Sequence, residues 1–358
     1  MQTRCIGDIR TLQDLEAVVR AIVFARPGEF SLTELPDPVP GPRDAVVQVE
    51  AVGICGTDLH VLDGEFAPTV FPIVPGHEAS GTVVSVGHEV TKVAPGDPVA
   101  IDPSFYCGEC SFCMAGHGNL CENWDGAGVG RTDGSTAELV LSPAKNLHRL
   151  PSSVDLALAA LIEPLSCAIH AYDLLPRWIG AHYLIYGAGT MGLIMAQLAP
   201  RAGAASVSVV DPNPKRRQAA RDVGIELVGS NAEEVARSGG WDTVIDCTGA
   251  VQAIEDGLKR VRRGGTFQQF GVAANEAQAA FSPFRIYNDE VTVVGSMAVL
   301  HSYARAVEMF AAGALNAKPM ISHAFALADY GEAIDTFQAG TGRKLQIRPQ
   351  AKESVTLL

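Results

Sequence analysis

Four cysteines lie within one short segment of this 358-residue chain. The segment CGECSFCMAGHGNLC has the spacing C-x2-C-x2-C-x7-C and supplies Cys107, Cys110, Cys113 and Cys121. Four thiolates this close together can close a tetrahedral Zn²⁺ site without an open position, which is typical of a structural site. An iron–sulfur cluster is the alternative, since cysteine pairs of similar spacing also hold such clusters. The Gly and Pro residues near the loop, and a separate nucleotide-binding motif further along the chain, favour zinc.

Three other segments supply a second set of metal-binding side chains. Cys55 and His60 come from CGTDLH, His77 and Glu78 from GHE, and Glu163 from LIEPLSC. This set has too few ligands to close another structural site, so a metal there would keep one position for water or a substrate oxygen. A single His or Glu in such a loop is most often an ordinary surface group. Their joint presence indicates a catalytic Zn²⁺ that acts as a Lewis acid on an alkoxide or carbonyl.

A glycine-rich segment, YGAGTMGLIMAQLA, follows an apolar strand and leads into a helix. Gly187, Gly189 and Gly192 have the G-x-G-x-x-G order, which indicates dinucleotide binding in this strand–turn–helix context. Gly187 allows the tight turn, Gly189 lets a pyrophosphate approach the backbone, and Gly192 lets the helix and strand pack closely. The N–H groups at the start of the helix then face the phosphates. The alternative interpretation is a plain helix-packing turn.

Asp211 ends the next strand, SVSVVD, nineteen residues after Gly192. A carboxylate at this place accepts hydrogen bonds from the adenosine ribose hydroxyls and repels a 2′-phosphate. The position therefore favours NAD over NADP. Lys215, Arg216 and Arg217 follow directly, and they can either accommodate a phosphate or interact only with solvent.

The pattern of strands and helices changes along the chain. Residues 21–150 alternate short β-rich runs with Pro and Gly clusters, which predicts a twisted, barrel-like β domain. From about His182, strands alternate with helices as far as VTVVGSM, which predicts an α/β domain with a doubly wound parallel sheet. Two amphipathic helices and a last strand, KLQIR, follow, and we expect this tail to return to the first domain. The predicted division is a catalytic domain at 21–175 completed by about 305–358, a nucleotide-binding domain at 176–304, and an N-terminal extension at 1–20.

Composition limits the classes of partner. Apolar residues make up 47% of the chain and charged residues 19%, which is typical of a soluble globular protein. The formal charge of −13 argues against nucleic acid or an anionic membrane as a partner. No run approaches the ~20 apolar residues of a membrane helix, and the first residues lack a secretory signal, so we expect a cytoplasmic protein. The eight cysteines then indicate metal binding before disulfides.

The motifs together resemble those of the zinc-containing medium-chain dehydrogenases, from about Ala21 to about Arg348. The resemblance rests on CGTDLH, PGHEASG, the four-cysteine loop, LIEPLSCAIHA, YGAGTMG, DCTGA and GRKLQI, and it is greatest to the polyol dehydrogenase branch. The family implies a GroES-like β-barrel catalytic domain and a Rossmann domain, with the active site in the cleft between them. It also implies one catalytic and one structural zinc, NAD as hydride acceptor, and a homodimer or homotetramer. The segment VTVVGSM is our candidate for a pairing edge.

The resemblance also implies the metal ligands. Cys55 and His77 would ligate the catalytic zinc, and Glu78 would be a ligand or a close carboxylate neighbour. Glu163 replaces a second cysteine that other branches of the family use, and it would be a labile ligand that exchanges with water. Asp58 would orient His77 from behind.

Roles in proton transfer and cofactor binding follow from the same resemblance. The Thr57 hydroxyl would bond the alcohol oxygen, and His60 would pass the proton to the surface. We expect the three glycines of the motif to contact the cofactor together with Thr190, Met191, Asp211, Arg216 and Thr248. Lys344, just before the last strand, is expected near the cofactor pyrophosphate.

Two positions depart from the polyol pattern. Val61 stands where a tyrosine usually follows the relay histidine, and Ala298 stands where an arginine usually follows the sixth strand. Sorbitol itself is therefore a doubtful substrate. We expect oxidation of a secondary hydroxyl of another small polyol, a cyclitol, an amino-polyol or a simple secondary alcohol to the ketone. A threonine-type dehydrogenase is an alternative in the same class.

Two further function classes are open from the sequence. One is a zinc-stabilised NAD-binding protein with little turnover, and the other is a zinc-free quinone reductase of the same superfamily. A binding protein has no physical need for Thr57, His60 and Glu163, and a quinone reductase normally lacks both the four-cysteine loop and Cys55. The presence of all these residues favours an active dehydrogenase.

Overall fold

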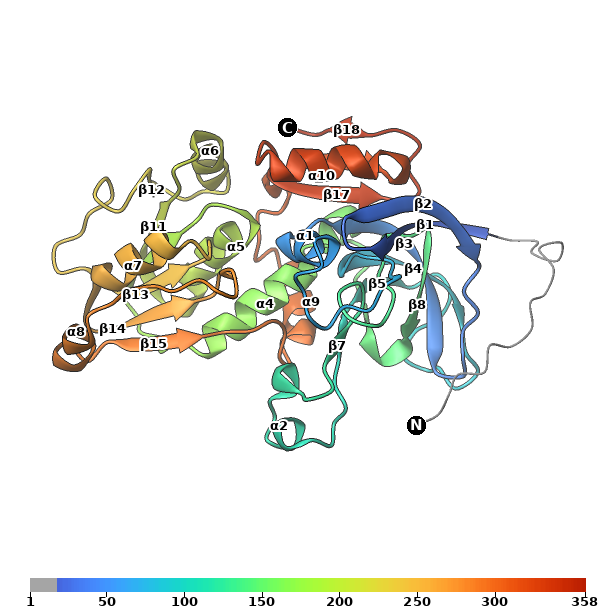
Figure 1. The fold of residues 1–358 in the computed structure, drawn as a ribbon, viewed down its shortest axis with the longest axis horizontal. Coiled ribbons are helices and arrows are strands. Elements are labelled where there is room, and N and C mark those ends of the chain that lie inside the picture. Colours follow the sequence, from blue (N-terminus) through green and yellow to red (C-terminus); the bar gives the residue numbers. More distant parts are fainter. Residues whose placement is uncertain (1–17) are drawn as a thin grey trace.

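The computed structural model describes residues 18–358, so most of the predicted N-terminal extension lies outside the described residues. Two large sheets occupy opposite halves of the molecule, and helices α4 (Ile162–Asp173) and α9 (Tyr303–Ala311) lie between them (Figure 1). In residues 18–358, no helix is both long enough and apolar enough to cross a membrane.

Six parallel strands form the first sheet, in the order β12-β11-β10-β13-β14-β15. The order extends outward in both directions from β10, which is the Rossmann arrangement. The predicted doubly wound parallel sheet is therefore confirmed. Its strands are β10 (Ala181–Tyr186), β11 (Ala204–Val210), β12 (Leu227–Gly229), β13 (Trp241–Asp246), β14 (Val261–Gln269) and β15 (Thr292–Gly295). The helices of this half are α5 (Thr190–Leu198), α6 (Pro214–Asp222), α7 (Val251–Arg260) and α8 (Pro283–Asn288).

The second sheet is mainly antiparallel and has the order β18-β16-β17-β3-β4-β5-β9, with β8 also paired to β3. Its strands are β3 (Asp44–Gly53), β4 (Glu78–Val86), β5 (Pro98–Ile101), β8 (Leu139–Pro143), β9 (Leu147–Arg149), β16 (Ile321–Ala326), β17 (Lys344–Arg348) and β18 (Val355–Thr356). The C-terminal strands join this sheet because β17 pairs with β3. The end of the chain therefore lies beside its first third (Figure 1).

Shorter elements complete the second half. The hairpin of β1 (Val18–Arg26) and β2 (Glu29–Pro36) packs beside the sheet, and β6 (Ser104–Phe105) pairs with β7 (Asp125–Gly126) at the base of a projecting lobe that carries α2 (Ser111–Met114) (Figure 1). The other helices are α1 (Gly56–Leu62), α3 (Leu156–Ala159) and α10 (Tyr330–Gln338). Single 3₁₀ turns lie at Gly118–Leu120, Ala144–Asn146, Ala199–Ala202, Lys318–Met320 and Leu327–Asp329.

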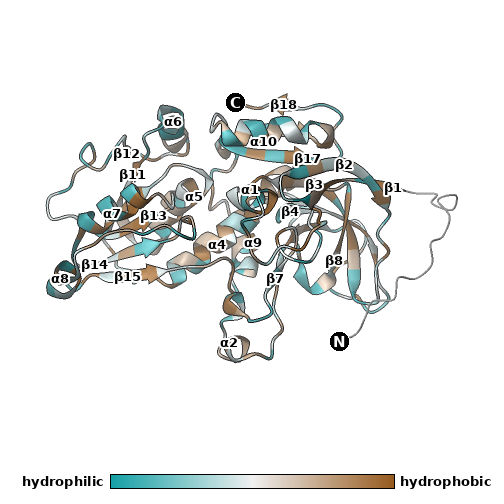
Figure 2. Ribbon diagram, in the orientation of Figure 1, coloured by the Kyte–Doolittle hydropathy of each residue, from teal (hydrophilic) through white to brown (hydrophobic). Residues whose placement is uncertain are grey.

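Helix α4 connects the two halves. Its buried face includes Leu165, Ile169 and Tyr172, which share one apolar cluster with Tyr183 of β10 and Ile194 of α5. Burying this many apolar side chains excludes water from the middle of the molecule, and the polar surfaces remain outside. Figure 2 shows the contrast, since α6 at the surface is largely hydrophilic. The first turn of α4 lies near the candidate metal residues, so this helix spans from them to the Rossmann core.

Candidate active site and metal centres

The candidate catalytic residues meet where β3 ends and β4 and β17 begin. Gly53, the last residue of β3, pairs with Glu78 of β4 and with Gln346 of β17. Cys55 follows as the N-cap of α1. A Cβ atom at Gly53 would collide with the Glu78 carboxylate and with the Lys344 side chain, so only glycine lets these two groups meet across the strand.

Cys55, His77 and Glu78 each direct one ligand atom into a common space. The three ligand atoms all lie within 4.8 Å of one another. His77 and Glu78 are buried, with 9% and 2% of their surfaces exposed. A thiol, an imidazole and a carboxylate at this separation suit a tetrahedral Zn²⁺ with a fourth position left open. The residues present therefore fit the predicted catalytic metal.

Asp58 supports both of the first two residues from the side. Its Oδ2 accepts a 2.8 Å hydrogen bond from the Cys55 backbone N–H, and its Oδ1 lies 3.4 Å from Nδ1 of His77. Burial lowers the pKa of His77, but the Asp58 carboxylate and Cys55 raise that pKa by more, so it ends well above its usual value. With Nδ1 directed at Asp58, Nε2 is the nitrogen available to a metal, as in many zinc-binding histidines.

Lys344 lies next to the metal group and also borders a cavity beside the glycine turn, so its expected position near the cofactor pyrophosphate remains a prediction. Its ammonium forms an ion pair with Glu78 and donates a 2.8 Å hydrogen bond to the Ile54 carbonyl oxygen, and only 3% of the residue is exposed. The pairing of β17 with β3 places Lys344, the first residue of β17, beside the metal group. Burial lowers the pKa of Lys344, but Glu78, Cys55 and Asp58 together raise it by more, so the ammonium stays charged.

Glu163 lies beside the cluster rather than in it. Its Oε1 accepts a hydrogen bond from the Cys167 thiol, one turn further along α4, at 3.3 Å. The pKa of Glu163 is raised to about 7, mainly by burial; His77 acts to lower this pKa and Glu78 acts to raise it. Among the described residues, the group of three converging ligand atoms does not include Glu163. The charges of His77 and Glu78 act on its carboxylate, and the Cys167 thiol donates a hydrogen bond to it.

The predicted relay residues lie on α1. The Thr57 hydroxyl oxygen is 3.7 Å from the Cys55 sulfur, next to the metal group. His60 lies one turn further along, is 45% exposed, and has Nδ1 2.8 Å from Oε2 of Glu65. Residues three apart on a helix share a face. The helix therefore leads from the buried cluster to solvent.

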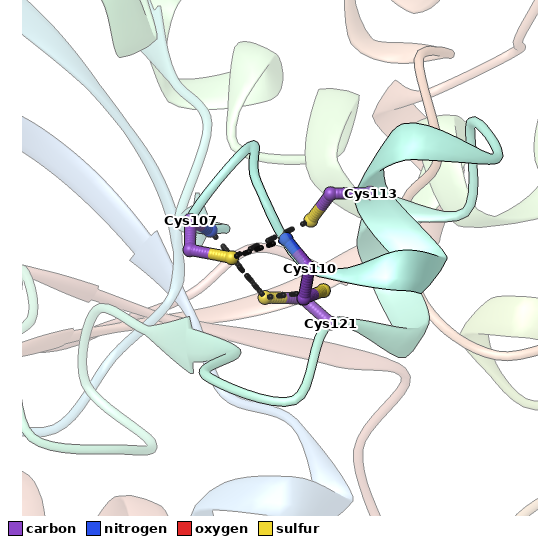
Figure 3. Close-up of side chains that lie close together, drawn as sticks. All are labelled: Cys107, Cys110, Cys113 and Cys121. Carbon is purple, nitrogen blue, oxygen red and sulfur yellow. Dashed lines mark hydrogen bonds between the residues drawn. The ribbon is translucent and has the colours of Figure 1, made fainter.

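The four-cysteine loop forms a compact group of sulfur atoms (Figure 3). Sulfur–sulfur distances are 3.9 Å for Cys107 and Cys113, 3.9 Å for Cys110 and Cys121, and 3.5 Å for Cys107 and Cys121. A tetrahedron with Zn–S bonds of ~2.3 Å has edges of about 3.8 Å, so the spacing fits zinc. Backbone N–H groups of Glu109 and Cys110 also lower the pKa of Cys107 to about 6, which favours its thiolate.

The glycine motif forms the turn between β10 and α5. Gly187 has φ = +95°, a left-handed conformation that favours glycine, and a Cβ at Gly192 would lie 1.8 Å from the Gly187 carbonyl oxygen. Gly189 is the N-cap of α5, and a Cβ built there meets no atom within 4 Å, so the backbone is open to a ligand. Each glycine therefore has the geometry that a dinucleotide site requires.

Asp211 follows β11 and is 3% exposed. One carboxylate oxygen accepts a hydrogen bond from the Ala188 N–H of the glycine turn at 2.9 Å, and the other accepts one from Asn213 at 2.8 Å. Arg216 lies 3.9 Å from this carboxylate, while Arg217 donates to the carbonyls of Asp211 and Pro212. Arg217 thus binds backbone carbonyl oxygens, and Arg216 lies at the candidate adenosine end of the site.

A cavity of about 400 Å³ opens beside the glycine turn. Gly189 and Thr190 border it from the Rossmann half, together with Lys215 and Arg216. His323, Phe337, Arg343 and Leu358 border it from the C-terminal segment, and we did not expect these residues from the sequence. They come from elements more than a hundred residues away, so no local motif could indicate them.

The remaining predicted residues are placed as follows. Thr248 follows β13, where its hydroxyl donates to the buried Asp246 at 2.6 Å and its methyl group faces Gly187. Met191, in the first turn of α5, packs partly against the apolar core. Val61 is fully buried in the cluster beneath α1, and Ala298 has φ = +50° in the segment after β15.

Known proteins are similar to this chain over most of its length. The chain matches the family model "Alcohol dehydrogenase GroES-like domain" over residues 41–152 and the model "Zinc-binding dehydrogenase" over residues 190–312. D-arabinitol dehydrogenase 1 of Uromyces fabae is 32% identical, covering 94% of this chain and 99% of that protein. Sorbitol dehydrogenase of Ovis aries is 33% identical, covering 92% and 96%, and L-threonine 3-dehydrogenase of Saccharopolyspora erythraea is 35% identical, covering 90% and 96%.

Solved structures give the same picture. A structure described as a zinc-binding dehydrogenase of Sinorhizobium meliloti 1021, with NADP bound, has a TM-score of 0.89 and 35% identity and covers 93% of this chain and 100% of its own. The predicted GroES-like and Rossmann fold class is confirmed by the family models and the parallel sheet. The zinc-free quinone reductase is disfavoured, because both cysteine-containing metal groups are assembled. The chain belongs to the zinc-containing medium-chain alcohol dehydrogenases.

Proposed function

We propose that the chain oxidises a secondary hydroxyl of a small polyol, cyclitol or related alcohol to the ketone, reversibly and with NAD. The observation that carries the proposal is the convergence of Cys55, His77 and Glu78 within 4.8 Å, with the Thr57 hydroxyl 3.7 Å from the Cys55 sulfur. A structural zinc site needs neither an open ligand position nor a neighbouring hydroxyl. A metal-assisted reaction that removes a proton from a substrate oxygen uses both.

The side chains of α1 supply the path for the proton. We assign Thr57 as the residue that accepts a hydrogen bond from the substrate hydroxyl and passes the proton on. His60, at the exposed end of the same face, delivers it to solvent, and Glu65 holds the ring through Nδ1 at 2.8 Å. Positioned proton transfer of this kind contributes ~10²–10⁴-fold to a rate.

The buried cluster supplies binding sites for the groups that the family implies. We assign Cys55 and His77 as zinc ligands, Glu78 as a ligand or close neighbour, and Glu163 as an exchangeable one. When bound, zinc acts as a Lewis acid on the substrate oxygen and the nicotinamide accepts the hydride. Asp58 keeps His77 oriented, and Lys344 balances the charge of Glu78.

We assign NAD as the preferred cofactor, with Asp211 as the residue that selects it. The carboxylate lies at the end of β11, next to the glycine turn, where it would accept hydrogen bonds from the ribose hydroxyls and repel a 2′-phosphate. Arg216 lies at the same place and would offset part of that repulsion. Replacing Asp211 by Ala should therefore shift the ratio of kcat/KM values toward NADP by about tenfold or more, and an unchanged ratio would refute this role.

The relatives support the substrate class. Proteins named D-arabinitol, sorbitol and D-altritol dehydrogenase are 32–33% identical to this chain over most of its length. L-threonine also carries a secondary hydroxyl, and the 35% identity to an L-threonine 3-dehydrogenase makes threonine the second candidate.

The decisive experiment is a substrate screen joined to metal counting on one preparation. Pentitols, hexitols, cyclitols, L-threonine and simple secondary alcohols are tested with NAD and with NADP, and bound zinc is counted. We expect two zinc ions per chain, as the two ligand groups require, and reduction of NAD by a polyol or cyclitol. Fully zinc-loaded protein that oxidises none of these alcohols would contradict the proposed function. Oxidation of L-threonine alone would select the second candidate.

We also propose that the chain forms a homodimer, or a tetramer built from such dimers, through the edge of the Rossmann sheet. β15 is the last strand in the order, and Val293 on it is 54% exposed. Phe284 and Tyr287 on the preceding helix are 70% and 83% exposed. An uncovered strand edge beside apolar side chains is a ready pairing surface. Light scattering should give a molar mass that is a multiple of 37.7 kDa, and Val293→Lys should reduce this mass. A monomeric wild type would refute the assignment.

We place the protein in the cytoplasm. The four sulfur atoms of the loop must stay reduced to hold zinc, and a reducing compartment keeps them so. Recovery of the active protein in the cytosolic fraction, with zinc in the loop, is the expected result of fractionation.

A further inference from the structure

A second cavity lies at the opposite end of the Rossmann sheet from the glycine turn. It has a volume of about 320 Å³ and is bordered by the loop at residues 236–241, the end of α7, the start of β14, and α8. β13 and β14 begin here, at Trp241 and Val261, whereas the dinucleotide motif lies at the carboxyl ends of the strands. Figure 1 shows β14 and β15 running from the α8 end toward the centre of the molecule. A ligand in this cavity is therefore not the dinucleotide.

Positive charge gathers around this cavity in a chain whose net charge is −13. Six of the chain's 27 Lys and Arg residues border it, with a single carboxylate among the lining residues. The six cations are Arg237, Lys259, Arg260, Arg262, Arg263 and Arg285, and the carboxylate is Asp289. Like charges this close together repel one another, so anions near the cavity would lower its electrostatic energy.

The ion pairs around the cavity neutralise only part of this charge. Arg260 pairs with Glu233 and Asp256, and Arg262 pairs with Asp242. With Asp289 included, four carboxylates face the six cations. Two positive charges are therefore not matched by a carboxylate. Within residues 18–358, Arg237 and Lys259 take part in none of the ion pairs.

Asp289 is shared between two guanidinium groups. Arg263 contacts it at 3.1 Å and is 82% exposed, and Arg285 contacts it at 3.4 Å. A guanidinium that shares its carboxylate keeps donors free for another anion.

The backbone at the cavity would by itself repel an anion, because α7 ends there and the last carbonyls of a helix carry partial negative charge. Arg285 removes this obstacle. Its two terminal nitrogens donate to the carbonyl oxygens of Leu258 and Val261. With those carbonyls covered, the free donors of the arginine and lysine side chains dominate the cavity.

We propose that this cavity binds a small anion that carries two or more phosphate charges, such as a phosphate ester or a diphosphate group. Guanidinium groups present planar pairs of donors that match phosphate oxygens, and several of them together prefer a multiply charged ligand. The volume of about 320 Å³ suits a small molecule rather than a peptide or nucleic acid. Because loop 236–241, α7 and α8 all border the cavity, the bound anion ties these three segments of the Rossmann domain together.

The test is titration calorimetry with inorganic pyrophosphate, and with inorganic phosphate as the weaker probe. The zinc-loaded enzyme is first saturated with NADH, so that the dinucleotide site is filled, and the ionic strength is about 0.15 M. We expect saturable binding of pyrophosphate under these conditions. Absence of saturable binding would overturn the proposal. Binding that occurs without NADH but is lost in its presence would also overturn it, because the anion would then occupy the dinucleotide site.

A pair of variants locates the site. Arg237→Ser with Lys259→Ser should weaken pyrophosphate binding by roughly tenfold or more, since two charge-assisted contacts are lost. Both side chains are exposed, so dehydrogenase activity should be unchanged. Unchanged activity also shows that the variant is folded. The matched control is Arg201→Ser with Lys352→Ser, which removes two exposed cations elsewhere and should leave the affinity unchanged. Equal losses in both variants, or no loss in the first, would contradict the assignment.

Discussion

The four-cysteine loop and the Cys55–His77–Glu78 group show two ways to build a metal site in one chain. The loop takes all its ligands from one short segment, and its sulfur atoms lie 3.5–3.9 Å apart, as a closed tetrahedron requires. The second group takes its ligands from distant segments, and its members already have other partners. Asp58 holds Cys55 and His77, Lys344 holds Glu78, and Cys167 holds the neighbouring Glu163.

The difference shows what each site must do. A closed set of thiolates gains its stability mainly from the metal. A set that must leave one position open depends on surrounding charges and hydrogen bonds to fix its geometry. We therefore expect damage to the loop to reduce folding, and damage to the second group to reduce activity or local stability.

The largest effect is expected for Cys110→Ser. Structural zinc contributes ~10 kcal/mol or more to the folding of small zinc domains, so loss of one thiolate should release the metal and greatly reduce the yield and thermal stability of the protein. Zinc analysis and thermal unfolding measure this, with Ser111→Ala in the same loop as control. A stable Cys110→Ser protein with a full complement of zinc would end the structural interpretation of the loop.

Cys55→Ser should act in the opposite way. It should lower kcat/KM by ~10³-fold or more, because the metal-dependent step is lost. The melting temperature and NADH affinity should stay close to wild type, as tested by thermal unfolding and fluorescence titration. If Cys55→Ser unfolded as readily as Cys110→Ser, the contrast between the two sites would be wrong.

Lys344→Met should destabilise the metal-free protein by ~3–5 kcal/mol, because it leaves the buried Glu78 carboxylate without a cation. Zinc supplies positive charge beside Glu78, so the loss should be smaller in the loaded protein. Denaturant unfolding with and without a chelator measures both values. Adding Glu78→Gln to the variant should recover part of the stability, and no recovery would show that the ion pair is not the cause.

The smallest effect concerns Asp102, at the base of the lobe that carries the cysteines. Burial raises the pKa of Asp102 from 3.8 to about 6, so between these pH values the folded chain binds more protons than the unfolded chain. Stability from this group is present at low pH and is lost as pH rises from about 4 to about 6. Asp102→Asn should remove a decline of about 2 kcal/mol between pH 4.5 and pH 7, measured by unfolding at both pH values. Parallel curves for the two proteins would contradict it.

Local motifs were predictable from the sequence, and long-range partners were not. The four cysteines and the three glycines each lie within a few residues of one another, so their geometry follows from spacing alone. The Lys344–Glu78 pair depends on β17 joining β3, which brings together residues 78 and 344. Gly53 and Cys167 were missed for the same reason, because their roles exist only once the strands and α4 are packed. The division at residues 175 and 304 and the roles of the site residues remain predictions.

Helix α4 has a thermodynamic consequence for the two binding events. Its first turn carries Glu163 beside the metal group, and its later turns are packed into the core that supports β10 and α5. A tilt of the helix that favours one arrangement of the nucleotide half moves that carboxylate at the same time. By reciprocity, whatever factor zinc contributes to dinucleotide affinity, the dinucleotide contributes to zinc affinity.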